Sequence, residues 1–268
     1  MSQSLRPSSA AQPFLGRIVE AVQERVATLR ARASFASLSD SSSQYQRRSF
    51  IEALTAQPPS IIAEVKKASP SKGLLRSDFD PLVLANAYDR GGAAAFSVVT
   101  EPQFFLGENS WIAQIRETTA RPIMRKDFVL DPLQVAESAA LGADAILLIA
   151  RLLSVAQMKE LAEAASRCRL DVLFEAHDAP DVEKIMQCAP RIVGINARDL
   201  DSFVVDVDQF ARLGSLLPAD VIKVAESGLD SAASLRSIGR LGYRAFLIGE
   251  AFVRADDPAG TIETYRAG

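Results

Sequence analysis

Ile61-Ile-Ala-Glu-Val-Lys-Lys-Ala-Ser-Pro-Ser-Lys-Gly73 is the stretch from which the fold of this chain can be worked out. Its first six residues predict a buried strand, on which Glu64 and Lys66 point the same way because strand side chains alternate between two faces. The Ser-Pro-Ser-Lys-Gly segment that follows predicts a loop. Charges at a strand end beside such a loop indicate either the rim of an active site or an exposed strand with a solvated ion pair.

Short β-prone runs of this kind recur from here to the end of the chain. Helical patterns lie between them, and some have clear start signals, such as Asp80-Pro81 and Asp131-Pro132. Eight strands alternating with helices favour a TIM (β/α)8 barrel over an open doubly wound sheet, which would need a glycine fingerprint after its first strand. We predict strands at 61–66, 94–100, 122–126, 145–149, 172–175, 192–196, 221–226 and 245–248.

The chain ahead of the first strand predicts a helical extension. Residues 1–13 are polar and Ser-rich, and we expect them to be disordered. Apolar residues at helical spacing predict a helix over 14–33, followed by a Ser-rich connector over 34–43 and a short helix over 47–56. We therefore expect a start and N-terminal extension over 1–57 that packs on a catalytic barrel over 58–268.

Composition narrows the classes of function. A net charge of −3 without a basic tract argues against a nucleic-acid partner. The longest apolar run, 143–153, contains two charges and is too short to cross a bilayer, and the polar amino terminus is no secretory signal. Cys168 and Cys188 lack metal or redox spacing, so we expect a reduced cytoplasmic setting. With His177 as the single histidine, a multi-histidine metal site is excluded.

Polar side chains stand at the ends of five predicted strands. Strands of a parallel barrel all end at the same face, where barrel enzymes carry their active sites. Ordinary loop-bordering polar residues would explain any one position but explain all five poorly. The sequence therefore predicts an active site built from Lys66, Lys126, Glu175, Asn196 and the Glu226-Ser227-Gly228 turn.

Lys66, Lys126 and Glu175 are the residues that we expect to carry acid–base chemistry. Burial lowers the pKa of a lysine and raises that of a glutamate, so such a set can exchange protons near pH 7. Asn196 offers a donor and an acceptor for a hydroxyl or carbonyl group. Lys223 has the opposite strand parity from the last glutamate of its strand, so we expect it to face away from the rim.

Two glycine turns, Ser227-Gly228 and Gly249-Glu250, follow the seventh and eighth strands. Backbone N–H groups at this place in a barrel commonly bind phosphate, although glycine is also frequent in tight turns that bind nothing. Three aromatic residues, Phe104, Phe105 and Phe128, follow the second and third strands, where they either sandwich an aromatic substrate or pack. We expect structural roles for Trp111 and His177, with contact between His177 and the rim as the alternative.

The sequence resembles the indole-3-glycerol-phosphate synthase family over the whole predicted barrel. The first stretch is highly specific to the family, whereas the glycine turns are shared with many phosphate-binding barrels. The helical extension also looks like that of the family, where it helps to close the mouth of the active site. The matching stretches are 62–73, 97–101 with Phe105, 126–128, Glu175, 194–200, 225–228 and 247–249.

This resemblance implies a fold, a reaction and a set of roles. The implied substrate is 1-(2-carboxyphenylamino)-1-deoxyribulose 5-phosphate, which undergoes ring closure with loss of CO2 and water and needs no metal or organic cofactor. Lys126 would be the general acid that protonates the ketone oxygen as the aromatic carbon attacks. Glu175 would transfer a proton during dehydration, and Lys66 would bind the substrate carboxylate and donate a later proton. Glu64 and Asn196 would orient these groups and the sugar hydroxyls.

The resemblance also implies binding residues. Ser69, Arg198 and Glu226 would bind or support the substrate. The slot for the anthranilate ring would be lined by Phe105, Phe128, Leu200 and Leu247, and the phosphate would be held by the backbone amides of Ser227, Gly228, Gly249 and Glu250. Some relatives have serine where Glu250 stands. A carboxylate there would repel a phosphate, so we expect the Glu250 side chain to turn away.

Two other classes of function stay open on the residues alone. Lysines at barrel strand ends also form Schiff bases, as in an aldolase that acts on a sugar phosphate. A non-catalytic phosphate-binding barrel would bind ligand without turnover. The expected partner is a small phosphorylated substrate, and we expect a monomer, with a weak dimer as the alternative.

Overall fold

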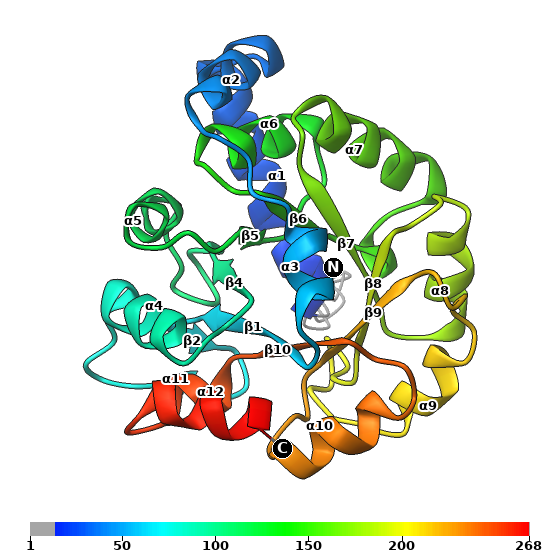
Figure 1. Cartoon of the computed structure of the whole chain (residues 1–268). Helices are drawn as coiled ribbons and strands as arrows, with labels where there is room; N and C mark the ends of the chain where they lie inside the picture. The colour runs from blue at the N-terminus through cyan, green and yellow to red at the C-terminus, as the bar shows by residue number, and fades with distance from the viewer. Residues whose placement is uncertain (1–13, 268) are drawn as a thin grey trace, which may run out of the picture.

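A closed barrel of eight parallel strands, ringed by helices, makes up most of residues 14–267, which the computed structural model describes (Figure 1). The predicted TIM barrel with an N-terminal helical extension is confirmed, and every predicted strand boundary lies within one residue of the observed one. Residues 1–13, which we expected to be disordered, lie outside the described part of the chain. The barrel strands are β1 (Ser60–Val65), β4 (Ala95–Val99), β5 (Ile123–Lys126), β6 (Ala145–Ile149), β7 (Asp171–Ala176), β8 (Ile192–Asn196), β9 (Ile222–Glu226) and β10 (Ala245–Ile248).

The helices between the strands begin where the sequence places capping residues. Asp80 and Asp131 accept backbone N–H groups of the first turns of α4 and α6, each of which has proline at its start. Ser154 and Ser231 form capping boxes at α7 and α10. The helices are α4 (Pro81–Arg90), α5 (Ser110–Thr118), α6 (Pro132–Ala140), α7 (Val155–Arg167), α8 (Ala179–Met186), α9 (Gln209–Gly214), α10 (Ala232–Gly239), α11 (Glu250–Arg254) and α12 (Pro258–Ala267). None of the helices within residues 14–267 is long and apolar enough to cross a membrane.

The extension ahead of β1 contains three α-helices, α1 (Phe14–Arg32), α2 (Phe35–Ser41) and α3 (Phe50–Ala56). Our expectation of a non-helical connector over 34–43 was wrong, since α2 and a short 3-10 turn occupy it. The serines that suggested a loop instead cap the helix: the Ser34 hydroxyl accepts the N–H of Ser37. Phe35 and Leu38 pack against the core, so tertiary contacts stabilise a segment of weak local propensity.

The inside of the barrel is an apolar column with charges at one end. Phe50 and Leu54 of α3 are fully buried and close the end at which the strands begin (Figure 1). Inward-facing side chains are apolar in the lower part of the strands, for example Ile62 and Met124. Two positions further along each strand, the same face carries Glu64 and Lys126. Because side chains on one face of a strand recur every two residues, ionisable groups lie at the opposite end of the barrel, which we call the mouth.

A buried ion pair attaches the segment before α3 to the closed end of the barrel. The Arg116 guanidinium lies 2.8 Å from the Asp144 carboxylate, and both side chains are almost fully buried. The Asp144 carboxylate also accepts the backbone N–H groups of Arg48 and Ile123, each at 3.0 Å. A single carboxylate thus joins a barrel strand, a flanking helix and the extension.

Candidate active site

The mouth of the barrel opens into a cavity of about 480 Å³. All sixteen residues that the sequence analysis assigned to the site line it, although they come from the ends of seven different barrel strands and the loops that follow them. They are Glu64, Lys66, Ser69, Phe105, Lys126, Phe128, Glu175, Asn196, Arg198, Leu200, Glu226, Ser227, Gly228, Leu247, Gly249 and Glu250. Within the described residues, no group of three or more His, Cys, Asp and Glu side chains is arranged to hold a metal ion.

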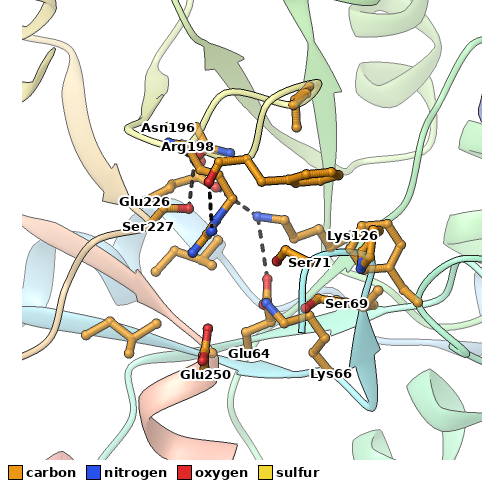
Figure 2. A pocket seen from close by; sticks show the side chains of 18 of the residues that line it. Glu64, Lys66, Ser69, Ser71, Lys126, Asn196, Arg198, Glu226, Ser227 and Glu250 are labelled. Atoms are coloured by element: carbon orange, nitrogen blue, oxygen red, sulfur yellow. Dashed lines mark hydrogen bonds and ion pairs between the residues drawn. The ribbon is translucent and has the colours of Figure 1, made fainter. Parts of the chain in front are cut away.

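Lys126 lies among three carboxylates. Figure 2 shows its ammonium group between Glu226 and Glu64, with Nζ 2.8 Å from Oε2 of Glu226 and 3.5 Å from Oε2 of Glu64. Oε2 of Glu175 lies 3.8 Å away. Lys66 neutralises part of this charge, since its Nζ lies 2.5 Å from Oε1 of Glu64. Two ammonium groups therefore face three carboxylates in one cavity.

Two glycines in the barrel wall make room for these carboxylates. A Cβ atom at Gly194 would collide with Oε1 of Glu226, and a Cβ atom at Gly249 would collide with Oε1 of Glu64. Any other residue at either position would displace a carboxylate from the lysine that it contacts. Gly249 thus has a packing role besides the phosphate role that the sequence suggested.

The expected lowering of a lysine pKa is wrong for Lys126. Burial by itself would lower the pKa of Lys126, but attraction to Glu226, Glu64 and Glu175 outweighs burial and raises it. Burial also favours the neutral form of Glu64, but the nearby lysines lower its pKa. Burial, opposed by Lys126 and reinforced by Glu175, raises the pKa of Glu226 to about 8. At neutral pH the lysine is thus charged, and Glu226 retains its proton in most of the molecules.

Asn196 connects the charged centre to the first glycine turn. Its side-chain oxygen accepts the Ser227 hydroxyl at 2.8 Å and the backbone N–H of Arg198 at 3.0 Å. Ser227 and Gly228 both have positive φ angles, of 66° and 68°, so two left-handed residues follow one another. Such a conformation is unfavourable for serine and is typical of functional sites.

The second glycine turn is accompanied by a cation that the sequence analysis missed. Gly249 directly precedes α11, and Glu250 begins it. Arg254, one helical turn later, also lines the cavity, and its Nε lies 3.5 Å from Oε1 of Glu250. The i, i+4 spacing of the two residues was the available signal. Arg254 offsets the negative charge that Glu250 brings to this turn.

Aromatic rings form one wall of the cavity. The rings of Phe105 and Phe128 lie 6.1 Å apart with an interplanar angle of 44°. Phe14, at the start of α1, and Phe203 also line the cavity and were missed, because ring positions on distant segments carry no local signal. Phe104 does not line it and packs edge-on against Phe14, with ring centroids 5.2 Å apart.

Glu101 is a further cavity residue without a predicted role. Its buried carboxylate accepts the backbone N–H groups of Gln103, Phe104 and Phe105, at 3.0, 2.6 and 3.0 Å. These bonds fix the loop that presents Phe105 to the cavity. The acid two to four positions before these amides was the signal, of the kind seen when a side chain caps a turn.

Three residues that the sequence analysis set apart from the site behave differently from one another. Lys223 faces away from the mouth, as expected, and donates to the carbonyl oxygen of Gly214 at 2.6 Å. Trp111 packs against Phe79 in the outer core. His177 is buried behind the rim, with Nε2 3.2 Å from Oε1 of Glu175. Burial, together with Arg151, lowers the pKa of His177 to about 4, so the imidazole is neutral at neutral pH.

A barrel of this kind, with two lysines and three carboxylates at its mouth, defines the class of (β/α)8-barrel enzymes that act by acid–base chemistry. Comparison with known proteins narrows the class: the family model described as indole-3-glycerol phosphate synthase matches residues 15–265. The chain belongs to the indole-3-glycerol phosphate synthase family.

Relatives from other organisms are similar in sequence to this chain over most of their length. An indole-3-glycerol phosphate synthase of Campylobacter concisus (strain 13826) is 46% identical over 218 residues, which is 81% of this chain and 83% of the relative. One of Albidiferax ferrireducens is 43% identical over 250 residues, or 91% of this chain and 95% of the relative.

Solved structures support the fold alone. 3-Hexulose-6-phosphate synthase from Salmonella typhimurium superposes with a TM-score of 0.63 at 14% identity, over 78% of this chain and 97% of that one. A mutant tryptophan synthase alpha-subunit from Pyrococcus furiosus superposes with a TM-score of 0.58 at 17% identity. The superposition covers 79% of this chain and 99% of that one. Both identities are too low to carry over an activity.

Proposed function

We propose that this protein is a carboxy-lyase of tryptophan biosynthesis that converts 1-(2-carboxyphenylamino)-1-deoxyribulose 5-phosphate to indole-3-glycerol phosphate, CO2 and water. The observation that carries the proposal is the Lys126 ammonium group held by Glu226 and Glu64 in the same cavity as Lys66. The reaction needs a proton at the ketone oxygen and a cation at the carboxylate, and two separate lysines supply them.

The cavity orients the substrate by its two ends. The phosphate binds at the glycine turns, to backbone amides of 227–228 and 249–250, and Arg254 adds positive charge there. The anthranilate ring lies between Phe105 and Phe128, with Leu200 and Leu247 along its edges. Arg198 and Ser69 contact the polar groups of the substrate. This orientation brings the ketone carbon toward the centre of the barrel, where Lys126 lies.

Ring closure and decarboxylation use the two lysines in turn. As the carboxyl-bearing ring carbon bonds to the ketone carbon, the ketone oxygen takes a proton from Lys126. The raised pKa of Lys126 keeps the donor charged before this step. Lys66 holds the carboxylate, and loss of CO2 returns the electron pair of the breaking bond to the ring system. Asn196 and Glu64 keep the reacting groups and the lysines in position.

Dehydration completes the indole ring. The hydroxyl group formed from the ketone leaves as water with a proton supplied by a lysine, and Glu175 accepts the proton released from the neighbouring carbon. Glu175 is almost fully buried, and its Oε2 accepts no hydrogen bond from the described residues. Nζ of Lys126 lies 3.8 Å from this oxygen, which can therefore take up a proton beside the lysine. Glu226, with its raised pKa, exchanges protons with Lys126 between steps.

The same charges argue against the Schiff-base alternative. An amine must be neutral to attack a carbonyl group, and catalytic Schiff-base lysines have lowered pKa values. The three carboxylates raise the pKa of Lys126 instead. Borohydride treatment in the presence of a ketose phosphate should therefore give no covalent adduct at Lys126, whereas an adduct would favour the aldolase.

Turnover of the substrate tests the proposal directly. Purified protein mixed with the carboxyphenylamino substrate should give indole fluorescence without added metal, and Lys126→Ala should lower kcat by about two to four orders of magnitude. Lys223→Ala is the matched control, because this lysine lies outside the cavity and should leave kcat unchanged. A near-normal rate for Lys126→Ala would show that the acid is misassigned.

The partner, the oligomeric state and the cellular compartment are part of the proposal as well. The partner is the small phosphorylated substrate, and the enzyme acts as a monomer in the cytoplasm, where its two free cysteines stay reduced. Light scattering of the purified protein should give a mass near 28.9 kDa.

A further inference from the structure

Arg25 of α1 forms a two-pronged ion pair with Asp127, the residue after Lys126. Nη2 of Arg25 lies 2.8 Å from Oδ1 of Asp127, and Nη1 lies 3.1 Å from Oδ2. The Asp127 carboxylate is fully buried, and the Arg25 side chain is 29% exposed. Paired hydrogen bonds between a guanidinium and a carboxylate fix direction as well as distance. The helix is therefore attached to the end of β5 in one orientation.

Asp127 is a fixed point that does not depend on α1. Its Oδ2 accepts the Thr100 hydroxyl at 2.7 Å and Nη2 of Arg125 at 3.2 Å, and its Oδ1 accepts the N–H of Phe128 at 2.8 Å. Burial would raise the pKa of Asp127, but Arg125 and Arg25 outweigh it and lower the pKa. The carboxylate is thus charged, and barrel residues hold it through three hydrogen bonds besides those from Arg25.

The same helix brings Phe14 to the cavity. Phe14 lines the cavity and packs edge-on against Phe104 and Phe203, with ring centroids 5.2 and 5.3 Å away. Eleven positions separate Phe14 from Arg25 along α1. Eleven residues make about three helical turns, so both side chains project from the same face, about 16 Å apart. Fixing the helix at Arg25 therefore fixes the height and rotation of Phe14.

Apolar contacts alone would leave that position loosely defined. The face between the two residues buries Ile18 and Val22 against the barrel, but such contacts are non-directional. Another ion pair, Arg30 with Asp131 at 2.5 Å, also joins α1 to the barrel. The Arg30 side chain is 67% exposed, and pairs this exposed contribute little. Arg25 supplies a part-buried, directional contact that the apolar face lacks. The other directional contact near Phe14, from the Leu15 N–H to Oδ1 of Asp201 at 3.4 Å, is long and exposed.

We propose that Arg25 is a positioning residue for substrate binding: its pair with Asp127 holds α1 where Phe14 closes the aromatic side of the cavity. The inference rests on the function proposed above and deepens it. Arg25 does not line the cavity itself, so it acts on substrate binding through Phe14. Loss of the pair leaves the proton-transfer groups in place and reduces the fraction of molecules with a closed wall. The effect therefore falls on KM and not on kcat.

Three variants of α1 test this assignment. Arg25→Met removes the charge and keeps most of the length, and Arg25→Lys keeps the charge without the two-pronged geometry. Arg30→Met is the matched control, with the same change on the same helix at an exposed pair. We expect Arg25→Met to raise KM about five- to tenfold with kcat within about twofold, Arg25→Lys to be intermediate, and Arg30→Met to match the unchanged enzyme.

A double-variant cycle separates positioning from general loosening. Phe14→Ala should raise KM to a similar extent, and the Arg25→Met/Phe14→Ala double variant should be no worse than the poorer single variant, since both act through one contact. Additive effects would overturn the proposal. An Arg25→Met enzyme that matches Arg30→Met, or one that loses kcat while KM is unchanged, would overturn it too.

Hydrogen exchange gives a readout that needs no turnover. Amides of α1 between Phe14 and Arg25 should exchange faster in Arg25→Met than in the unchanged enzyme or Arg30→Met, with β5 unaffected. Unchanged exchange in Arg25→Met contradicts this inference alone. An unchanged enzyme that fails to turn over substrate contradicts the proposed function alone, because the docking of α1 is measured separately.

Discussion

Lys126 shows how neighbouring charges decide the chemistry of a residue. The lysine is largely buried, which alone would favour its neutral form, yet three carboxylates keep it charged. The surplus negative charge is reduced at Glu226, whose pKa is raised by burial and by the neighbouring Glu175. The site therefore holds one mobile proton in addition to those on the lysines. An acid–base sequence with several proton transfers requires such a reserve.

His177 gives a pH-dependent contribution to stability that can be measured. Its pKa of about 4 in the folded protein lies below the ordinary value of 6.5. Between these two pH values the imidazole is therefore protonated in the unfolded chain and neutral in the folded protein. The free energy of unfolding should therefore fall as the pH drops below 6.5. Relative to His177→Gln, we expect a loss of roughly 1.5 kcal/mol between pH 6.5 and 5.

Denaturant unfolding of both proteins at several pH values measures this difference. The comparison with the variant is needed because Glu226 contributes to the free energy of unfolding with the opposite sign. The pKa of Glu226 is raised, so its stabilising contribution is present at low pH and is lost as the pH rises toward 8. Parallel stability profiles for the two proteins would show that His177 is not buried as a neutral imidazole.

The positions of the site residues were predictable from the sequence, but their ionisation was not. Parity along a strand placed Glu64, Lys126 and Lys223 on the correct faces, because the period of two is a local property. The pKa of Lys126 depends on carboxylates from three other strands, and their distances follow only from closure of the barrel. Phe14 reaches the cavity from a helix that lies far from it in sequence.

At the scale of elements, the turn between β9 and α10 carries the most unusual backbone. Ser227 and Gly228 are both left-handed, and a Cβ atom at Gly228 would meet Val205 at 2.8 Å and Val207 at 3.0 Å. In the proposed function the phosphate binds to the backbone amides of this turn, and that binding depends on the geometry of the turn. The turn is therefore the element in which a single methyl group should affect binding without touching the acid–base groups.

Gly228→Ala should raise KM about tenfold and change kcat little, because a left-handed alanine costs about 1–2 kcal/mol and pushes the turn away from the anion. Gly239→Ala is the matched control at the end of the following helix, where a new Cβ atom would meet nothing within 4 Å. Steady-state kinetics of both variants decides the matter. Equal KM values would remove this turn from the phosphate site.

Elements with strong local signals were predicted well, and those stabilised by tertiary contacts were not. The strands matched because their β-prone runs are bounded by caps and glycines, as at Gly142 and Ser154 on either side of β6. Helix α2 was missed since its serines resemble a loop in isolation, and its Phe35 is fixed by the barrel and by Arg167, 4.2 Å from the ring. Such contacts are invisible in a local window of sequence.

At the scale of the whole molecule, the two ends of the barrel have separate tasks. The mouth carries the strained turn and the crowded charges, whereas the closed end carries α3 and the buried Arg116–Asp144 pair. This division is general among (β/α)8 barrels, in which the carboxyl ends of the strands serve function and the amino ends serve stability. Changes at one end should therefore leave the other almost untouched.

Asp144→Ala should lower the free energy of unfolding by about 3–5 kcal/mol, because it leaves Arg116 buried without its partner. In the folded enzyme at 25 °C, kcat and KM should stay within about twofold of normal. Asp89→Ala is the control: it breaks the half-exposed Asp89–Arg121 pair and should cost about 1 kcal/mol or less. A large loss of kcat in folded Asp144→Ala would contradict the separation of the two ends.

The course of α1 also bears on how the protein can be handled. Because Phe14 lines the cavity, any tag or partner domain joined ahead of this helix would be tethered beside the substrate entrance. Arg266, near the other terminus, lies against Gly92 and lines a hollow with Pro59 and Ser60 at the opposite end of the barrel. Purification handles and fluorescent fusions therefore belong on the carboxyl side, where they leave the mouth of the cavity free.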